Sequence, residues 1–356
     1  MNERSGPRVF VTRRLPGDAL SRLAGEVELD LWQEARPPGP EELRQHTREA
    51  EGLLCLLCDR VDEALLAASP RLRVISSYSV GVDHLDLAAA TARGIPVGHT
   101  PGVLTETTAD LAFALLLAAA RRIPEADRFV REGHWQLQQG WQPHLLLGRD
   151  VHGATLGILG LGPIGRAVAR RARGFDMRVI GWTPSGRHVP GIELMGLEEV
   201  LEHSDFVSLH LALAAGTRGL LDGGRLRRMK RGAILVNTAR GGIVDEAELA
   251  RALCEGRLAA AALDVFSREP LEPDSPLLRA PNLVLAPHIG SASVATREAM
   301  AEQAVRNLLA GLRGERLPHC ANPEVYAPAG GGEPSGGSGG PQRSRKSRGA
   351  ATRAPR

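Results

Sequence analysis

Lysine is almost absent from this sequence: Lys230 and Lys346 are the two lysines among 356 residues. Schiff-base chemistry needs a lysine amine, and a Walker-type phosphate loop needs a lysine that contacts the phosphates. Lys230 lies in the run RRMKRG, at an expected charged helix end, which is a poor place for either task. The scarcity of lysine therefore excludes these two classes of chemistry.

Long apolar runs are also missing. The longest, residues 111–120, is flanked by Asp110 and Arg121 and falls short of the roughly 20 residues that cross a bilayer. The opening stretch MNERSGPRVFVTRR has no apolar segment of the length typical of a signal or transit peptide. We therefore expect a cytoplasmic protein with no membrane partner.

Cysteine is scarce as well, although two of the four cysteines have the C-x-x-C spacing of a candidate metal or redox motif. Cys55 and Cys58 lie in GLLCLLCD, a run typical of a buried strand, where residues three apart point to opposite faces. Two such thiols are poorly placed to share a metal or a disulfide. We interpret them as core residues of a protein in a reducing compartment, and we expect no metal site.

Positive charge is concentrated near the end of the sequence. Lysine and arginine total 44 against 41 for aspartate and glutamate, yet residues 341–356 hold six of the 44 and no acid. The rest of the chain is mildly acidic, so the basic isoelectric point says little about an active site. Residues 327–356 are rich in Gly, Ser, Pro and Arg, a composition that cannot form a packed core. We interpret them as a disordered basic tail and expect no nucleic-acid partner.

Strand-like and helical stretches alternate twice along the chain. The first series occupies residues 7–103, and the second begins near residue 154 with TLGILGLG. Such alternation is typical of parallel βαβ units. We predict an α/β fold of two Rossmann-like or flavodoxin-like lobes with parallel sheets, a cleft between the lobes and a disordered C-terminal tail. The strands expected in the first series are 7–15, 26–32, 52–58, 72–83 and a short one within 92–102.

A long helical pattern, LTETTADLAFALLLAAARR, occupies residues 104–122. Thr105 or Thr107 can cap its start, and the paired arginines at its end suit the helix dipole. The pattern is too apolar for an ordinary surface helix, which predicts burial between lobes or subunits.

The stretch LGILGLGPIGRAVARRA contains G-x-G-x-x-G at Gly160, Gly162 and Gly165. It follows an apolar strand and opens an alanine-rich helix, which is the context of a dinucleotide-binding loop. The first glycine permits a tight turn, the second lets the backbone approach a pyrophosphate, and the third lets helix and strand pack closely. The helix N-terminus offers unpaired N–H groups to the phosphates. We therefore predict a dinucleotide site here.

The end of the next strand favours NADP(H). An NAD-binding site usually has an acid there, which binds the ribose 2′-hydroxyl. The stretch MRVIGWTPSGRH has no acid and offers Thr183, Ser185 and Arg187 instead. Hydroxyls with an arginine suit a 2′-phosphate. We predict NADP(H) as the cofactor, and NAD(H) remains the alternative if Arg187 is only a loop charge.

Five motifs occur in a fixed order: LGILGLGPIG, GTRGLL, MKRGAILVNTARGGIVDE, AALDVFSREPL and PNLVLAPHIGSAS. Together they resemble the D-isomer-specific 2-hydroxyacid dehydrogenase family, over residues 8–326. Within that family the chain is similar to glyoxylate/hydroxypyruvate reductases in SVGVDHLDL, TPGVLTETTADLA and RNLLAGLRGE. The resemblance implies a substrate-binding lobe of residues 1–103 plus 288–326, a dinucleotide-binding lobe of residues 104–287, and chemistry in the cleft between them.

The resemblance also implies roles for individual residues. Arg240 corresponds to the arginine that clamps the substrate carboxylate, His288 to the proton donor and Glu269 to the acid paired with that histidine. Asp264 corresponds to the residue that holds the nicotinamide carboxamide. The implied cofactor contacts also include Pro163, Ile164, Ala212, Thr217, Thr238 and Gly290, and the implied substrate contacts also include the amides of Val80 and Gly81, with Ser291 and Trp141.

These residue types suit the reduction of a 2-oxo acid. The substrate carboxylate must be held so that the carbonyl faces the hydride, and arginine is a planar, permanently charged, two-pronged donor. The growing oxyanion must be stabilised and protonated, and histidine titrates near neutrality. A neighbouring Glu269 carboxylate would interact favourably with the imidazolium form of His288, which suits the reductive direction.

Trp141, in WQP, is similar to a tryptophan that reaches the partner subunit's site in glyoxylate/hydroxypyruvate reductases, which implies a homodimer. Its spacing from Trp135 is longer than in the family pattern. An aromatic anchor in a dimer interface, outside the site, is the alternative.

We therefore predict an NADPH-dependent reductase that converts glyoxylate or hydroxypyruvate to glycolate or D-glycerate. One alternative is a 2-ketogluconate reductase of the same family, in which a wider cleft would change only the substrate. The other is a non-catalytic, dinucleotide-sensing binding protein similar to the co-repressors that share this fold. Turnover of a short 2-oxo acid distinguishes an enzyme from a binding protein.

Overall fold

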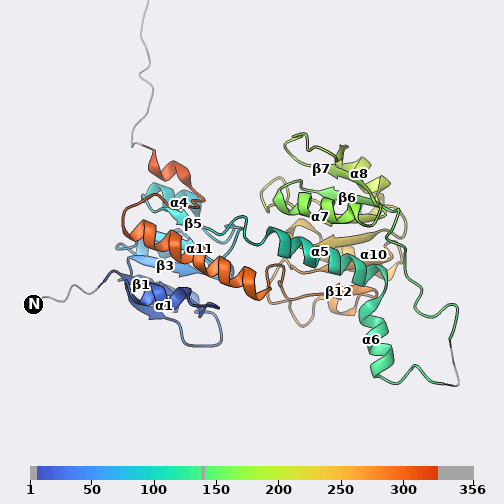
Figure 1. Cartoon of the computed structure of the whole chain (residues 1–356), viewed down its shortest axis with the longest axis horizontal. Helices are drawn as coiled ribbons and strands as arrows, with labels where there is room; N and C mark the ends of the chain where they lie inside the picture. The colour runs from blue at the N-terminus through green and yellow to red at the C-terminus, as the bar shows by residue number, and fades with distance from the viewer. Residues whose placement is uncertain (1–5, 138–140, 328–356) are drawn as a thin grey trace, which may run out of the picture.

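The computed structural model describes residues 6–137 and 141–327, which form two lobes that lie side by side (Figure 1). Within these residues, one lobe contains a five-stranded sheet and the other a seven-stranded sheet, and the strand pairings in both are parallel. The predicted α/β class with two parallel-sheet lobes is confirmed. The predicted tail, from residue 328 onward, lies outside the described residues.

The five-stranded lobe has the strand order β2-β1-β3-β4-β5, which is the flavodoxin-like order. Its longest helix is α11, which returns from the other lobe to pack on β3 and β4 and against α1 (Figure 1). Its elements are β1 (Arg8–Val11), α1 (Ala19–Ala24), β2 (Glu28–Leu31), α2 (Pro40–Thr47), β3 (Gly52–Cys55), α3 (Glu63–Ala68), β4 (Val74–Ser77), α4 (Leu87–Ala92), β5 (Val97–Gly98) and α11 (Val294–Leu312).

The seven-stranded lobe has the order β12-β11-β10-β9-β6-β7-β8. The order reverses between β6 and β9, as in the Rossmann fold, and ligands bind in the crevice at such a switch point. Its elements are α5 (Thr105–Ala120), α6 (Ile123–Arg131), β6 (Thr155–Leu159), α7 (Pro163–Arg173), β7 (Arg178–Trp182), β8 (Glu193–Leu194), α8 (Leu197–His203), β9 (Phe206–Leu209), α9 (Gly223–Arg228), β10 (Ile234–Asn237), α10 (Glu246–Cys254), β11 (Ala260–Leu263) and β12 (Leu283–Leu285).

Each sheet is buried on both faces, which explains why its central strands are apolar without polar alternation. In β10, Ile234 and Val236 pack into the cluster that contains α5, while Leu235 packs into the cluster on the opposite face. In β3, Leu53 and Leu54 divide in the same way between two further clusters. The helices therefore cover both faces and leave the carboxyl ends of the strands for ligands.

Helix α5 is buried within the seven-stranded lobe, where it packs on β10, β11 and α7. The predicted threonine caps are wrong, because the N-cap position is Leu104. The Thr107 hydroxyl instead hydrogen-bonds to the Thr296 hydroxyl of α11, at 2.6 Å. The Thr107 hydroxyl therefore contacts a residue of another helix and not a backbone N–H of its own helix. Among the residues that the structure describes, no helix has the length and apolar composition of a membrane-spanning segment.

The C-x-x-C stretch does not continue as a strand. Strand β3 ends at Cys55, which is buried, whereas Cys58 is exposed in the turn that follows. The turn is held by Asp59, whose carboxylate accepts hydrogen bonds from the Leu56 N–H at 2.8 Å and the Thr12 hydroxyl at 2.5 Å. Both thiols are free, but the predicted core position is wrong for Cys58, because the strand ends three residues before it.

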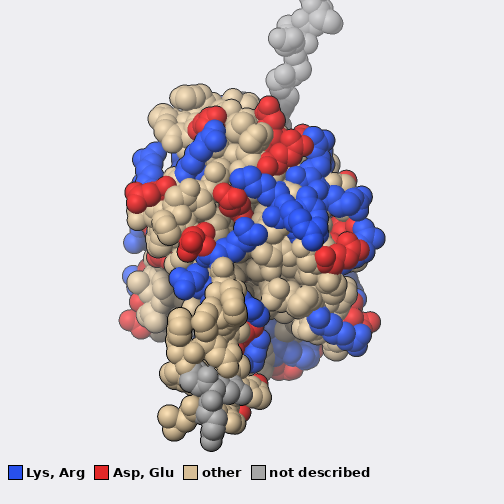
Figure 2. Space-filling view, turned by 90° about the vertical axis from the view of Figure 1, so that its right-hand side faces the viewer, with Lys and Arg blue, Asp and Glu red and all other residues tan. Residues whose placement is uncertain are grey.

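Helix α6 projects from the seven-stranded lobe (Figure 1), and each of its residues keeps some exposure to solvent. The surface at this lower end of the molecule is mostly uncharged in Figure 2. Trp135 and Trp141, in the segment that follows α6, are 63% and 86% exposed. Apolar side chains of this size are rarely left in water without a partner surface.

Candidate active site

A cleft of about 1400 Å³ lies between the carboxyl ends of the two sheets and has residues of both lobes in its wall. Arg240 and His288 both line it, although they follow different strands. Most of the other predicted site residues line it too: Val80, Gly81, Gly160, Gly162, Pro163, Ile164, Thr183, Ser185, Ala212, Thr217, Thr238, Asp264, Gly290 and Ser291.

The glycine loop connects β6 to α7 at the switch point of the seven-stranded sheet. Gly160 has φ +101°, a conformation that favours glycine, and a Cβ there would lie 2.5 Å from the carbonyl oxygen of His210 on the neighbouring strand. A Cβ on Gly165 would collide with the carbonyl oxygen of Gly160. At Gly162 the space is open, so the backbone there is accessible to a ligand.

The residues around this loop fit a dinucleotide. Gly162 is the N-cap of α7 and Pro163 its first residue, so the first N–H groups of the helix are left for a phosphate. Among the described residues, Thr238 Oγ1 and Asp264 Oδ2 are buried polar atoms with no hydrogen-bond partner. Such atoms require a partner, and the amide and hydroxyl groups of a nicotinamide nucleoside could supply one.

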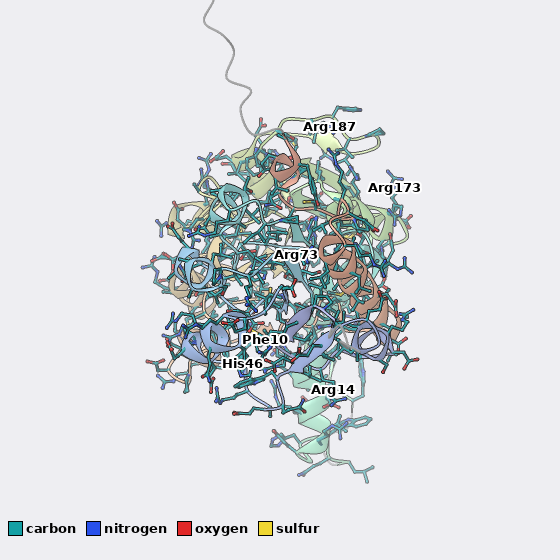
Figure 3. The ribbon with its side chains drawn as sticks, turned by 90° about the vertical axis from the view of Figure 1, so that its left-hand side faces the viewer. Phe10, Arg14, His46, Arg73, Arg173 and Arg187 are labelled. Carbon is teal, nitrogen blue, oxygen red and sulfur yellow. The ribbon has the colours of Figure 1, made fainter. Side chains whose placement is uncertain are left out.

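The end of β7 carries the residues predicted to contact a 2′-phosphate. The hydroxyls of Thr183 and Ser185 lie 3.4 Å apart in the wall of the cleft. Arg187 is exposed at the rim of the molecule (Figure 3), and its backbone N–H donates to Ser185 Oγ at 3.4 Å. The structure therefore brings the two hydroxyls to the cleft and leaves the arginine at the surface nearby.

Thr217 is used mainly to hold its own loop. Its hydroxyl donates to the carbonyl of Ala212 at 2.6 Å and accepts from the Ala214 N–H at 2.8 Å. Ala212 and Ala214 line the cleft beside the glycine loop. Thr217 thus shapes the backbone of the wall.

The loop after β10 positions Arg240. Asn237 bridges the loop, because its side chain accepts from the Ala239 N–H at 3.0 Å and donates to the Arg240 carbonyl at 2.9 Å. Gly241 follows, and a Cβ there would collide with the backbone of Phe266. Only glycine lets this loop approach the segment that carries Glu269.

The Arg240 guanidinium reaches across the cleft to the five-stranded lobe. Its Nε donates to Asp83 Oδ1 at 2.9 Å, and its Nη1 donates to the Ala239 carbonyl at 2.8 Å. Nη2 lies so close to Gly81 that a Cβ on this glycine would collide with it. Burial alone would raise the pKa of Asp83, but the charge and hydrogen bond of Arg240 lower this pKa below its usual range. Asp83 is therefore ionised at neutral pH.

His288 and Glu269 form a hydrogen-bonded pair, with Nδ1 of the ring 2.7 Å from Glu269 Oε2. Glu269 also accepts from the Phe266 N–H at 2.9 Å, which fixes its carboxylate. Burial would raise the pKa of Glu269, but the hydrogen bond and charge of His288 lower it. The ring nitrogen Nε2 is left to act on a ligand, as a general acid requires.

Asp264 sets the backbone at the histidine. His288 has φ +54°, a region that non-glycine residues seldom occupy. The turn is held because the His288 N–H donates to the Asp264 carbonyl at 2.8 Å and the Ile289 N–H to Asp264 Oδ1 at 2.7 Å. Burial raises the pKa of Asp264, and the Ile289 N–H opposes this change. Such backbone conformations concentrate at functional sites.

Two other histidines near strand ends have local partners. Nε2 of His84 lies 3.0 Å from Ser77 Oγ, and Nε2 of His210 lies 2.8 Å from Ser208 Oγ. Burial lowers the pKa of His84 to about 4 and that of His210 to about 3. Both rings are therefore neutral at physiological pH and act as local hydrogen-bonding and packing residues.

Several cleft residues were not predicted from the sequence. They include Leu57 after β3, Asp83 and His99 near the ends of β4 and β5, Thr108 on α5 and Arg297 on α11. The strand predicted over residues 72–83 ends at Ser77, and Asp83 lies in the loop that follows, so an acid beyond the carboxyl end of a parallel strand was a signal that could have revealed it. Trp141, by contrast, lies on the exposed segment after α6 rather than in this cleft of its own chain.

Comparison with known proteins gives consistent relatives. The family model for "D-isomer specific 2-hydroxyacid dehydrogenase, NAD binding domain" matches residues 113–290. The glyoxylate reductase of Korarchaeum cryptofilum is 51% identical over 323 residues, which cover 90% of this chain and 97% of the relative. That of Thermofilum pendens is 46% identical over 325 residues, which cover 90% and 95%.

Solved structures agree in fold. A crystal structure of a Thermus thermophilus protein superimposes with a TM-score of 0.83 at 50% identity, covering 88% of this chain and 99% of that one. An NADPH-dependent glyoxylate/hydroxypyruvate reductase from Sinorhizobium meliloti, in complex with NADP and malonate, gives 0.79 at 34% identity, covering 89% and 97%.

The two-lobed architecture with a Rossmann switch point at its cleft is that of a dinucleotide-dependent oxidoreductase. The extent of the sequence match then defines the family. This chain belongs to the D-isomer-specific 2-hydroxyacid dehydrogenases, with NAD(H) or NADP(H) as its class of cofactor. The family predicted from the sequence is confirmed.

Proposed function

We propose that this protein reduces glyoxylate or hydroxypyruvate to the corresponding D-2-hydroxy acid, with NADP(H) as the preferred cofactor. The observation that carries the proposal is that Arg240 and His288 share one cleft with the glycine loop, and that Glu269 is hydrogen-bonded to His288. The names of the full-length relatives, glyoxylate reductases at 51% and 46% identity, support the substrate.

The chemistry follows from the positions of the side chains. The Gly81 amide and the Arg240 guanidinium, which lie against each other, bind the substrate carboxylate. The bound nicotinamide supplies the hydride for the carbonyl carbon. His288 donates the proton from Nε2 to the carbonyl oxygen, and Glu269 holds the ring through Nδ1 and stabilises its charged form.

We propose that the two lobes have the functions that the sequence suggested. Residues 104–287 bind the dinucleotide, and residues 1–103 with 288–326 bind the substrate. In the dinucleotide site, the glycine loop and the start of α7 receive the pyrophosphate, Thr183, Ser185 and Arg187 the 2′-phosphate, and Asp264 the carboxamide. The exposure of Arg187 leaves its side chain free to turn toward a bound phosphate.

A homodimer is also part of the proposal, in the cytoplasm. Helix α6 and the segment after it expose the apolar side chains of Ile123, Val130, Trp135 and Trp141, which a second copy could cover. Trp141 would then approach the partner's cleft and narrow it. A Trp141→Ala variant that stays dimeric by light scattering but accepts longer 2-oxo acids would support this role, whereas unchanged substrate preference would leave Trp141 as an interface anchor.

The test of the proposed function is a kinetic panel. Purified protein is mixed with NADPH or NADH and with glyoxylate, hydroxypyruvate, pyruvate or 2-ketogluconate, and the reduced-nicotinamide absorbance is followed. We expect the highest kcat/KM with NADPH and one of the first two acids. A preference for 2-ketogluconate would favour the sugar-acid alternative. Tight NADPH binding without turnover of any short 2-oxo acid would favour the dinucleotide-sensing binding protein.

A further inference from the structure

Among the described residues, one ion pair of an arginine or lysine with an acid crosses from one lobe to the other, and it is made by Arg240. The other arginine and lysine pairs in this part of the chain join residues of the same lobe, as Arg225 with Glu198 and Arg313 with Glu26 do. In the crossing pair, Nε of Arg240 lies 2.9 Å from Asp83 Oδ1. The residue proposed to clamp the substrate is thus also the electrostatic bridge between the lobes.

The guanidinium is hydrogen-bonded at Nε and at Nη1, whereas Nη2 is left open. Asp83 occupies Nε, and the Ala239 carbonyl occupies one N–H of Nη1. An arginine has five N–H donors in a fixed fork, so one N–H of Nη1 and both of Nη2 are left for other acceptors. Nη2 is the nitrogen that lies against Gly81. The open donors therefore adjoin the backbone amide proposed to bind the substrate carboxylate.

We propose that Asp83 is a positioning residue for carboxylate recognition. It holds the Nε edge of Arg240, so that the Nη2 edge stays over Gly81 and meets the carboxylate of a short 2-oxo acid. This inference rests on the proposed function, because it concerns the substrate of that same site. It goes beyond that function in giving a task to an acidic residue placed where an anionic ligand binds.

An acid at this position has two opposing effects on an anionic substrate. Its charge repels the substrate carboxylate, but interactions between partly exposed charges change affinity only a few-fold. A misplacement of about 1 Å in a group that positions the substrate can cost ~100-fold. The second effect is larger, so removal of Asp83 weakens substrate binding rather than strengthening it.

The position of Asp83 also makes recognition of the substrate carboxylate depend on the relative position of the two lobes. Asp83 follows β4 of the five-stranded lobe, and Arg240 follows β10 of the other. The oriented guanidinium consequently exists only when the lobes lie at the separation seen here. Substrate binding and this arrangement of the lobes therefore stabilise each other.

Three variants test the proposal: Asp83→Ala, Asp83→Asn and, as a matched control, Glu202→Gln, which alters an exposed pair with Arg228 inside one lobe. KM and kcat are measured with glyoxylate, NADPH affinity by fluorescence, and binding of oxamate, a non-reducible carboxylate, to the NADPH complex. We expect Asp83→Ala to raise KM and weaken oxamate binding ~10-fold or more, with a smaller change in kcat and unchanged NADPH affinity. Asp83→Asn keeps an acceptor for Nε and should recover most of the loss.

Unchanged or tighter oxamate binding by Asp83→Ala would overturn the proposal, as would an asparagine variant no better than the alanine variant. If Asp83→Ala does not fold, Asp83→Ser, whose side chain is too short to reach Nε, takes its place in the comparison with Asp83→Asn. Wild-type protein that binds oxamate but reduces no 2-oxo acid would refute the proposed function alone. If the wild-type protein is active and Asp83→Ala has the same kinetics as Glu202→Gln, the role of Asp83 alone is refuted.

Discussion

The two lobes have the same architecture, a parallel sheet between helices, but they contribute to the cleft in different ways. The seven-stranded lobe supplies side chains and a specialised loop: the glycine turn at Gly160, the guanidinium of Arg240 and the carboxylate of Glu269. The five-stranded lobe supplies backbone, at Val80 and Gly81, and the charged side chains of Asp83 and Arg297.

This difference shows why a cofactor site is easier to find in a sequence than a substrate site. A dinucleotide needs a glycine pattern of fixed spacing, because the loop must approach a pyrophosphate. The substrate side needs only a free amide and enough room for a guanidinium from the other lobe. Gly81 is required there by a tertiary neighbour, Arg240, and not by its own backbone conformation.

The largest effect is expected where the lobes meet. His288→Ala should lower kcat ~1000-fold, because the general acid is lost, and leave NADPH affinity nearly unchanged. Stopped-flow reduction of glyoxylate and NADPH fluorescence measure the two quantities. His203→Ala, at an exposed histidine that ends α8, is the control and should behave as wild type. A His288→Ala enzyme that retains most of its rate would remove His288 from the mechanism.

Gly81→Ala tests the substrate side alone. The added Cβ would collide with the end of a flexible side chain, so the protein should fold with an unchanged melting temperature. The displaced guanidinium should lower kcat/KM for glyoxylate ~100-fold while NADPH still binds normally. Equal losses of substrate and NADPH affinity would show that the lobes are not separate in function.

Substitutions of two glycines in the loop should have different effects, one on folding and the other on cofactor binding. Gly165→Ala would collide with the rigid carbonyl of Gly160 and should lower the free energy of unfolding by ~2 kcal/mol. Gly162→Ala has open space and should fold normally, yet weaken NADPH binding ~10-fold by obstructing the pyrophosphate. Thermal unfolding and fluorescence titration distinguish them. If both variants are equally unstable, the open space at Gly162 is not a ligand site.

Substitutions at the end of β7 should change the preference for NADPH over NADH. Ser185→Asp places a carboxylate where a 2′-phosphate is proposed to bind, so the ratio of kcat/KM for NADPH over NADH should fall ~10-fold. Kinetics with both cofactors at fixed glyoxylate measure it. Arg187→Ala should lower the same ratio without improving NADH. An unaltered ratio in both variants would place the 2′-phosphate elsewhere.

The smallest effect concerns stability and pH. Burial lowers the pKa of His210 to about 3, below the value near 6.5 of an unfolded histidine. The unfolded state therefore binds more protons, and stability is full above pH 6.5 and declines as the pH falls below it. His210→Gln should reduce the loss between pH 7 and pH 5.5 by ~1 kcal/mol, measured by urea unfolding. An identical loss in the variant would mean that His210 protonates freely in the folded protein.

The sequence predicted the features that depend on local pattern. The glycine loop, the fold class and the family followed from motifs, and Arg240 and His288 were placed at strand ends that do meet in one cleft. Contacts between distant segments were not predictable in this way. Asp83 and Arg240 are 157 residues apart in the sequence, and only the approach of the lobes makes them neighbours.

Local rules also failed where a tertiary partner competed. Thr107 has the residue type of a helix cap, but α5 begins at Thr105, and the Thr107 hydroxyl inside its first turn binds Thr296 of α11. Arg187 was predicted from its place after β7, yet it lies at the surface beside the cleft. In both cases the residue and its element were predicted correctly, and the atom that it contacts depended on the three-dimensional arrangement.

The hydrogen bond between Thr107 and Thr296 has a mechanical consequence. It joins the first turns of α5 and α11, the helices that begin where the chain passes between the lobes (Figure 1). Two linked segments of this kind act as a hinge between the lobes. Residues near a hinge move least when the lobes rotate relative to each other. His288 lies six residues before α11 begins, so the proposed acid–base pair would stay assembled if the lobes moved apart, while the contact of Arg240 with Asp83 would break.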